Sequence, residues 1–183
     1  MNHAVIVGTG SYVPDNAITN DDLAKIVDTS DEWIFSRTGI KKRHISRGEN
    51  TSDLAYEAGK KALQQAGMDA SELDLIICAT ITPDSFMPSV ACMVQERLQA
   101  TNAAAFDLAA ACTGFVYAIA TAASFIQSGI YSKILVIGAE TLSKVLDWTD
   151  RSTCVLFGDG AGAVVMASSS EAAGVRAIKL LSD

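Results

Sequence analysis

The residues in this sequence best suited to covalent chemistry are its four cysteines, Cys78, Cys92, Cys112 and Cys154. They are widely spaced and form no Cys-x-x-Cys pair, so the pattern predicts neither a zinc site nor a disulfide framework. Three of them stand mostly among apolar residues and are interpreted as buried structural thiols. Cys112 has different neighbours and is the candidate nucleophile.

Cys112 lies where a predicted buried strand passes through small residues into an apolar helix, in the segment FDLAAACTGF at residues 106–115. At the amino end of a helix, unpaired backbone N–H groups and the positive end of the helix dipole favour a thiolate. The alternative is that Cys112 is a small apolar residue filling the junction. No neighbouring base completes a catalytic set, and neither His3 nor His44 is a convincing one, so the local sequence leaves the reaction undecided.

Composition limits the classes of protein to which the chain can belong. Of the 183 residues, 49% are hydrophobic and 19% are charged, which is enough for a large core, and the formal net charge of −7 argues against a nucleic-acid-binding surface. No run approaches the roughly 18 to 20 apolar residues that span a bilayer. The first ten residues lack the basic start and the small-residue cleavage site of a signal peptide. We therefore expect a cytoplasmic protein that binds neither nucleic acid nor a membrane.

The elements that must position Cys112 alternate between strands and helices. Buried strands are predicted at residues 3–7, 73–80, 103–108, 133–139 and 161–167. Helices are predicted at residues 21–27, 31–34, 54–66, 88–98 and 113–128, the fourth opened by Pro88 and the last enclosed by other elements. The order βαβαβαββ predicts one α/β domain with a mainly parallel sheet covered on both faces.

Two glycine-rich segments are interpreted as turns and not as nucleotide loops. The first strand is expected to stop at Gly8, and the GTG segment is no dinucleotide fingerprint because Val13 stands where the motif needs its last glycine. Residues 158–162 (GDGAG) lack the Lys-Ser/Thr of a phosphate loop. Residues 175–181 resume a strand-like pattern before the sequence stops at Asp183, which suggests truncation.

Six segments in order along the chain resemble β-ketoacyl-acyl-carrier-protein synthase III. They are GTGSYVP at 8–14, TSDEWI at 29–34, RTGI at 37–40, AAACTGF at 109–115, TDR at 149–151 and FGDGAG at 157–162. The resemblance implies a thiolase-like fold, in which two βαβαβαββ halves build a five-layered αβαβα architecture and residues 1–183 form the amino-terminal, nucleophile-bearing half. It also implies the initiating condensation of type II fatty-acid synthesis, in which a cysteine takes an acyl group from acyl-coenzyme A and condenses it with malonyl-acyl-carrier protein, with loss of CO2.

The same resemblance assigns roles to individual residues. Cys112 becomes the acyl-accepting nucleophile, and its backbone N–H helps to hold the thioester oxyanion. The matching coenzyme A positions are Trp33 and Arg151 about the adenine, Arg37 on the phosphate side and Thr29 as a polar contact. Stacking a base between an indole and a guanidinium is physically sound.

The acyl pocket is assigned in the same way, to Leu142 and Phe157. Phe86 and Met87 match an aromatic gate contributed across a homodimer interface. Met87 stands where the family often has Phe, and its flexible side chain suits acyl groups other than acetyl. The Gly158 segment is expected to be a tight turn that frames the site.

The resemblance also implies what this chain lacks. The family's decarboxylating His and Asn lie in the second half, so we expect these 183 residues to be inactive alone, and we expect no prosthetic group or metal. Alternatives are a related synthase of a secondary pathway, making a quinolone or polyketide, and a non-catalytic truncated fragment that serves as a scaffold.

Overall fold

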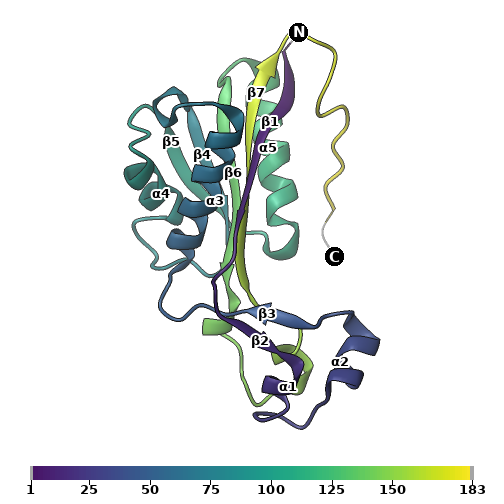
Figure 1. Cartoon of the computed structure of the whole chain (residues 1–183). Helices are drawn as coiled ribbons and strands as arrows, with labels where there is room; N and C mark the ends of the chain where they lie inside the picture. Colours follow the sequence, from purple (N-terminus) through teal and green to yellow (C-terminus); the bar gives the residue numbers. More distant parts are fainter. Residues whose placement is uncertain (1, 182–183) are drawn as a thin grey trace.

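A five-stranded sheet forms the centre of the computed structural model, which describes residues 2–181 (Figure 1). The strands lie in the order β1-β7-β6-β4-β5. Their bounds are His3–Tyr12 for β1, Leu75–Ala79 for β4, Ala104–Leu108 for β5, Lys133–Thr141 for β6 and Asp159–Ser169 for β7. The predicted order βαβαβαββ is confirmed, with short additional elements inserted after β1 and after β6.

The sheet is mixed, which corrects the prediction of a mainly parallel one. β4 pairs in parallel with β5 and β6, but β7 pairs antiparallel with both β6 and β1. No long crossover helix separates β6 from β7, so the chain returns beside β6 in the opposite direction. β1, β4, β5 and β6 consequently share one direction, and β7 runs against all of them.

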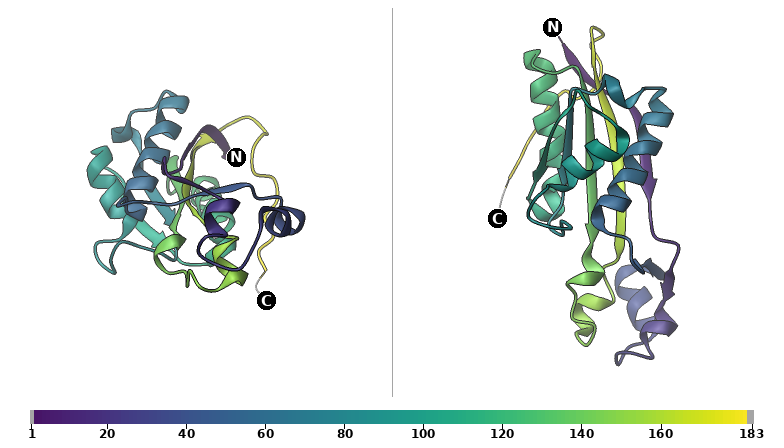
Figure 2. Two further views of the ribbon diagram at one scale, coloured as in Figure 1. Left: turned by 60° about the horizontal axis from the view of Figure 1, so that its bottom comes forward. Right: turned by 90° about the vertical axis from the view of Figure 1, so that its left-hand side faces the viewer.

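Helices cover both faces of the sheet, as predicted (Figure 2). α3 (Thr51–Ala66) and α4 (Val90–Leu98) pack on one face, and α5 (Gly114–Ser128) packs on the other. α3 ends at Gly67 in the left-handed region, while Pro88 does not open α4, because Ser89 caps that helix and Pro88 precedes the cap. The two apolar layers on either side of the sheet hold its strand ends rigidly in place.

β1 continues through Tyr12 and does not stop at Gly8 as predicted. Gly8 and Gly10 are strand residues that lie against α3. A Cβ on Gly8 would stand 2.4 Å from the Ala62 carbonyl oxygen, and one on Gly10 would stand 2.2 Å from that of Ala58. These glycines therefore serve close helix-to-strand packing and not a turn. The expected turn at Gly158 is likewise shorter, because β7 already begins at Asp159.

The inserted elements form a small lobe, defined here as residues 17–44 and 148–157, at one end of the sheet (Figure 1). It contains β2 (Ala17–Thr19) paired with β3 (Lys42–His44), and the helices α1 (Asn20–Leu23), α2 (Asp31–Thr38) and α6 (Arg151–Cys154). Its core consists of four buried residues, which are Leu23, Ile34, Cys154 and Val155. Three 3-10 turns complete the fold, η1 (Ala70–Glu72), η2 (Ala111–Thr113) and η3 (Leu142–Lys144).

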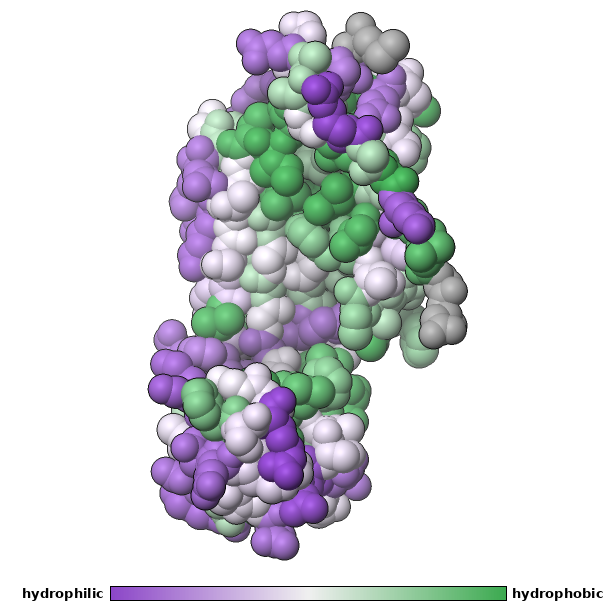
Figure 3. Space-filling view, turned by 90° about the vertical axis from the view of Figure 1, so that its right-hand side faces the viewer, coloured by the Kyte–Doolittle hydropathy of each residue, from purple (hydrophilic) through white to green (hydrophobic). Residues whose placement is uncertain are grey.

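α5 is open on its outer side, contrary to the prediction of an enclosed helix. Ala118, Ala122 and Ile126 are buried against the sheet, but Val116 is 54% exposed. Residues 175–181 form no strand and run as an irregular segment near α5, to which Val175 is joined through Gln127. Figure 3 shows hydrophobic side chains gathered over this side of the molecule.

One helical stretch of the described chain, Ala111–Ser128, is long and apolar enough to cross a membrane. This finding corrects the prediction that no run approaches a spanning length. Length and composition alone do not identify a membrane helix, because the core helix of a soluble protein meets the same criterion.

Candidate active site

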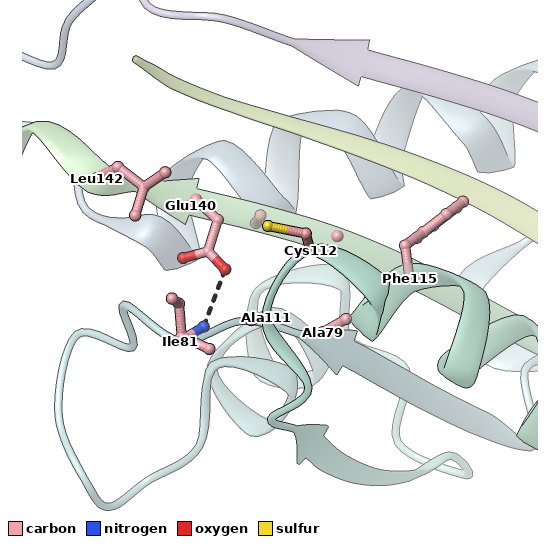
Figure 4. Close-up of a pocket in the computed structure, with 9 residues that line it drawn as sticks. Ala79, Ile81, Ala111, Cys112, Phe115, Glu140 and Leu142 are labelled. Carbon is pink, nitrogen blue, oxygen red and sulfur yellow. Dashed lines mark hydrogen bonds between the residues drawn. The ribbon is translucent and has the colours of Figure 1, made fainter. Parts of the chain in front are cut away.

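Cys112 is exposed and lines an apolar cavity of about 200 Å³ at one end of the sheet (Figure 4). It lies on η2, in the short connection between β5 and α5. Ala111 from η2 and Phe115 from α5 also line the cavity. The remaining lining residues come from the ends of β4 and β6 and from the segments that follow these strands: Ala79, Ile81, Gly138, Ala139, Glu140 and Leu142. The cavity thus lies beyond the carboxyl ends of parallel strands, where open α/β sheets commonly bind ligands.

The backbone before Cys112 adopts an unusual conformation. Ala111 has a φ of +45°, in the left-handed region that residues with a Cβ rarely adopt. The Thr113 hydroxyl donates a hydrogen bond of 2.9 Å to the Ala110 carbonyl, closing the turn. Such strain, about 1 to 3 kcal/mol, persists where surrounding structure enforces it and is concentrated at functional sites.

The predicted position of Cys112 at the start of a helix is confirmed. η2 leads directly into α5, whose first residue is Gly114. A Cβ on Gly114 would stand 3.2 Å from the Ala79 Cβ, so glycine lets the helix approach β4 closely. The chain therefore presents the thiol at the amino-terminal end of α5, where the helix dipole favours negative charge.

The other three cysteines are poorly placed for chemistry. Cys78 and Cys154 are buried and Cys92 is partly buried, and all are free thiols. Burial raises the pKa of Cys78 well above its usual value, and it raises the pKa of Cys154, with a further contribution from Asp150. Both thiols are therefore held in the neutral form at pH 7, whereas Cys112 faces the cavity.

The structure brings Leu142 to the cavity but not the other predicted pocket residues. Leu142 lines it from η3. Phe157 is partly buried after α6 and is not among the lining residues. Phe86 and Met87 are 102% and 85% exposed in the loop between β4 and α4. Their assignment to a gate across a dimer interface stays a prediction.

Glu140 and Ile81 are cavity residues that the sequence reasoning missed. The Glu140 carboxylate accepts hydrogen bonds from the Ile81 N–H at 2.9 Å, from the Thr80 hydroxyl at 3.3 Å and from the Thr82 hydroxyl. Glu140 directly follows the predicted strand at residues 133–139, so the sequence alone could have indicated that it stands at the end of a strand. Its partners were not, because they depend on β6 lying beside β4.

The four positions matched to coenzyme A lie together in the small lobe. Two guanidinium groups contact the Trp33 ring, with the Arg37 Cζ 4.4 Å and the Arg151 Cζ 4.8 Å from its centroid. Arg37 also donates to the Trp33 carbonyl at 3.2 Å, and Arg151 donates to the Asp28 carbonyl at 3.1 Å. The Thr29 hydroxyl is buried without a hydrogen-bond partner. The cluster thus combines a flat ring, two cations and a free polar group.

Two helix caps and one buried arginine hold this cluster together. Ser30 caps α2, accepting from the Trp33 N–H at 3.1 Å, and Asp150 caps α6, accepting from the Ser152 N–H at 2.8 Å. Arg43 donates to the Ile18 carbonyl, to the Asn20 side chain at 2.7 Å and to the Val155 carbonyl at 3.0 Å. It therefore joins β2 to the segment after α6.

Neither histidine of the chain lines the cavity. His3 begins β1, and the His44 Nδ1 lies 2.6 Å from the Pro14 carbonyl oxygen in the small lobe. Within residues 2–181, the site therefore presents a nucleophile without a histidine base. A cavity of this kind can hold an acyl chain, and the Cys112 sulfur can accept that chain as a thioester.

Comparison with known proteins agrees with this geometry. The family model of 3-oxoacyl-[acyl-carrier-protein] synthase III matches residues 106–183. β-Ketoacyl-[acyl-carrier-protein] synthase III of Clostridium acetobutylicum is 60% identical over 171 residues, which are 93% of this chain and 53% of that protein.

Solved structures give the same result. The chain superimposes on 3-oxoacyl-[acyl-carrier-protein] synthase III of Aquifex aeolicus with a TM-score of 0.90 and 57% identity, over 92% of this chain and 55% of that one. The priming β-ketosynthase of the R1128 polyketide pathway also gives a TM-score of 0.90, at 38% identity over 92% of this chain and 51% of that one. The chain spans about half the length of these relatives, has their thiolase-like fold and belongs to the β-ketoacyl-acyl-carrier-protein synthase III family.

Proposed function

We propose that this chain supplies the acyl-accepting half of an initiating condensing enzyme of type II fatty-acid synthesis. The observation that carries the proposal is the exposure of Cys112 at an apolar cavity, directly before the apolar helix α5. The high identity to proteins named β-ketoacyl-acyl-carrier-protein synthase III supports the same activity.

In the first step, the Cys112 thiolate attacks the thioester carbonyl of acyl-coenzyme A. A new carbon–sulfur bond forms to Cys112, and the coenzyme A thiolate leaves. The Cys112 backbone N–H stabilises the oxyanion of the tetrahedral intermediate, as backbone donors do in other acyl transfers. The apolar walls of the cavity accept the acyl chain.

In the second step, malonyl-acyl-carrier protein loses CO2 and the resulting carbanion attacks the Cys112 thioester. The acyl–sulfur bond breaks, and the thiolate of Cys112 is regenerated. This step needs groups that stabilise the carbanion, for which the family's His and Asn are the candidates. We expect both outside residues 1–183.

Coenzyme A binding is proposed for the small lobe. The adenine stacks on Trp33, Arg151 covers the base, and Arg37 approaches the phosphates. Arg151 already lies over the ring, so it moves outward by about the thickness of a base when the nucleotide enters. The Thr29 hydroxyl is buried without a hydrogen-bond partner, so it can make a polar contact to the nucleotide only when the cluster opens. We further propose a cytoplasmic homodimer, in which Phe86 and Met87 close the partner's cavity.

Intact mass spectrometry of the protein at its natural length tests the acyl-transfer step. Incubation with acetyl-coenzyme A is expected to add one acetyl group, and the Cys112→Ala variant is expected to add none. A Cys92→Ala variant is the matched control, since Cys92 is partly buried and outside the cavity. Acylation of the Cys112→Ala variant at an equal rate would contradict the proposal.

A related synthase of a secondary pathway is the second candidate. The structural likeness to a polyketide priming ketosynthase favours it, and Met87 is compatible with larger acyl groups. A series of acyl-coenzyme A thioesters separates the two, because a fatty-acid initiator is expected to prefer short primers. The third candidate, a non-catalytic fragment that serves as a scaffold, predicts that Cys112→Ala causes no loss of cellular function, whereas the initiating enzyme requires that thiol.

A further inference from the structure

We infer that Glu140 is a positioning residue that sets the shape of the acyl cavity by fixing the backbone of the loop at Ile81. This inference rests on the proposed function, because it concerns the wall of the same cavity. The Ile81 side chain is 50% exposed and lines the cavity from the loop that follows β4. What holds that loop therefore decides where the wall stands.

The Glu140 carboxylate is engaged with this loop on both of its oxygens. One oxygen accepts from the Ile81 N–H at 2.9 Å, and the other accepts from the hydroxyls of Thr80 and Thr82. Figure 4 shows the carboxylate directed to the Ile81 nitrogen. With its oxygens occupied by loop donors, Glu140 acts on the cavity through the loop and not as a base for Cys112.

A buried network continues from this anchor into the body of the protein. The Thr82 hydroxyl accepts from the Thr141 N–H at 2.9 Å, and the Thr82 carbonyl accepts from the Thr51 hydroxyl at 2.5 Å. The hydroxyls of Thr51 and Thr141 lie 2.8 Å apart. The start of the loop is thus tied to the end of β6 and to the first turn of α3.

Two further carboxylates hold the rest of this connection. Asp84 accepts from the Ser52 N–H at 2.9 Å, and Asp107 accepts from the Val90 and Ala91 N–H groups at 2.8 Å. Between them, Phe86 and Met87 project outward. Of these three anchors, only Glu140 lines the cavity at Cys112, which is why we assign its wall to Glu140.

Alkylation of Cys112 by two reagents of different size measures the shape of the wall without any coenzyme A. In the protein at its natural length, peptide mass spectrometry gives the rate constants for iodoacetamide and for N-hexyl-iodoacetamide at Cys112. Their ratio reports how well the apolar wall holds a chain. In Glu140→Ala, the rate constant for N-hexyl-iodoacetamide divided by that for iodoacetamide is expected to fall about fourfold, which is the effect of losing about one buried methylene. Glu96→Ala, an exposed change on α4, is the matched control.

Conservative variants separate position from charge. Gln keeps the length and an acceptor for Ile81, so Glu140→Gln is expected to retain the parental ratio. Asp keeps the charge but is shorter, so Glu140→Asp is expected to lower the ratio. If Glu140→Ala does not fold, the inference is still tested by whether the alkylation ratio is higher in Glu140→Gln than in Glu140→Asp.

The reverse order, with Asp like the parent and Gln impaired, would show an electrostatic role and overturn the inference. A ratio unchanged from the Glu96→Ala control in both Asp and Ala variants would also overturn it. Failure of the proposed function is a separate result, seen as absence of acylation by acyl-coenzyme A while the alkylation ratios remain measurable.

Discussion

The cavity at Cys112 and the cluster at Trp33 are built in different ways. The cavity is formed at the ends of β4 and β6, and every residue of β4 is buried between two helical layers. The Trp33 cluster stands on a small lobe with four buried core residues, and its side chains are largely at the surface. Packing fixes the first site, while caps, ring contacts and Arg43 fix the second.

This difference implies a division of sensitivity between chemistry and binding. A substitution that changes volume at the sheet ends should alter the reaction at sulfur, since close-packed interiors transmit small changes. A substitution in the small lobe should alter nucleotide binding and leave the thiol unaffected. The four predictions below test whether the two sites are separable in this way.

The largest effect is expected from filling the cavity at Gly138. A Cβ there would stand 3.1 Å from the Phe115 Cδ2, so Gly138→Val crowds Phe115 and adds side-chain volume to the wall of the cavity that both residues line. We expect acylation by acetyl-coenzyme A to slow about 100-fold, the scale of a misplacement near 1 Å, with the affinity for coenzyme A unchanged. Stopped-flow acylation and calorimetric binding measure the two quantities.

Gly162→Val is the matched control for this prediction. Gly162 pairs with Gly138 across the sheet, and a Cβ on it meets no atom within 4 Å. If both variants slowed acylation equally, the effect would belong to the sheet and not to the cavity.

The next effect is expected from removing the ring at Trp33. Base stacking on an aromatic ring contributes about 1 to 3 kcal/mol, so Trp33→Ala should weaken coenzyme A binding at least about fivefold. The rate of Cys112 alkylation by iodoacetamide should not change. Phe35→Ala, on the same helix and 45% exposed, is the control. Loss of Cys112 reactivity in Trp33→Ala alone would show that the sites are not separable.

A smaller effect on function is expected from Arg43→Met, which acts on the stability of the small lobe. The change leaves the acceptors on Ile18, Asn20 and Val155 without this donor in a buried place. Each unsatisfied buried acceptor costs about 1 to 3 kcal/mol, so the small lobe should open more often. Hydrogen exchange should rise in residues 17–44 and stay unchanged in β4 and β6. The exposed Arg47→Met variant is the control, and faster exchange throughout the sheet would contradict a local role.

The smallest effect is expected from the cap at Asp150. Hydrogen bonds from the Ser152 hydroxyl and N–H lower the pKa of Asp150 below the usual 3.8. The cap therefore stabilises α6 above that pH and is lost as the pH falls through the lowered value. Tryptophan fluorescence should show a change below about pH 4 that Asp150→Asn shifts or removes. An identical acid transition in the Asn variant would assign it to other groups.

The sequence predicted the element order and the place of Cys112 because both depend on local patterns. Alternating apolar runs indicated the strands, and small residues before an apolar helix marked the thiol. The prediction of a mainly parallel sheet was wrong because the pairing partners of β7 are not set by local sequence. The continuation of β1 through Gly8 and Gly10 was missed because their close contacts with α3 arise only in the packed fold.

The candidate site shows the same limit. Leu142, which was named through the resemblance, lies at the cavity, whereas Ile81 and Glu140 could be identified only by knowing which strand ends meet. The open side of α5 was also mispredicted, since an apolar sequence does not say what covers it. The Trp33 cluster was predicted only through resemblance, because Trp33 and Arg151 are far apart in sequence.

The central claim is that Cys112 is activated by its place at the beginning of α5. The most direct measurement is the rate of its alkylation by iodoacetamide in the folded protein, compared with the rate for an unstructured cysteine peptide at the same pH. We predict faster labelling of Cys112, which prior incubation with acetyl-coenzyme A prevents. Labelling no faster than the peptide, with acyl transfer intact, would contradict the account.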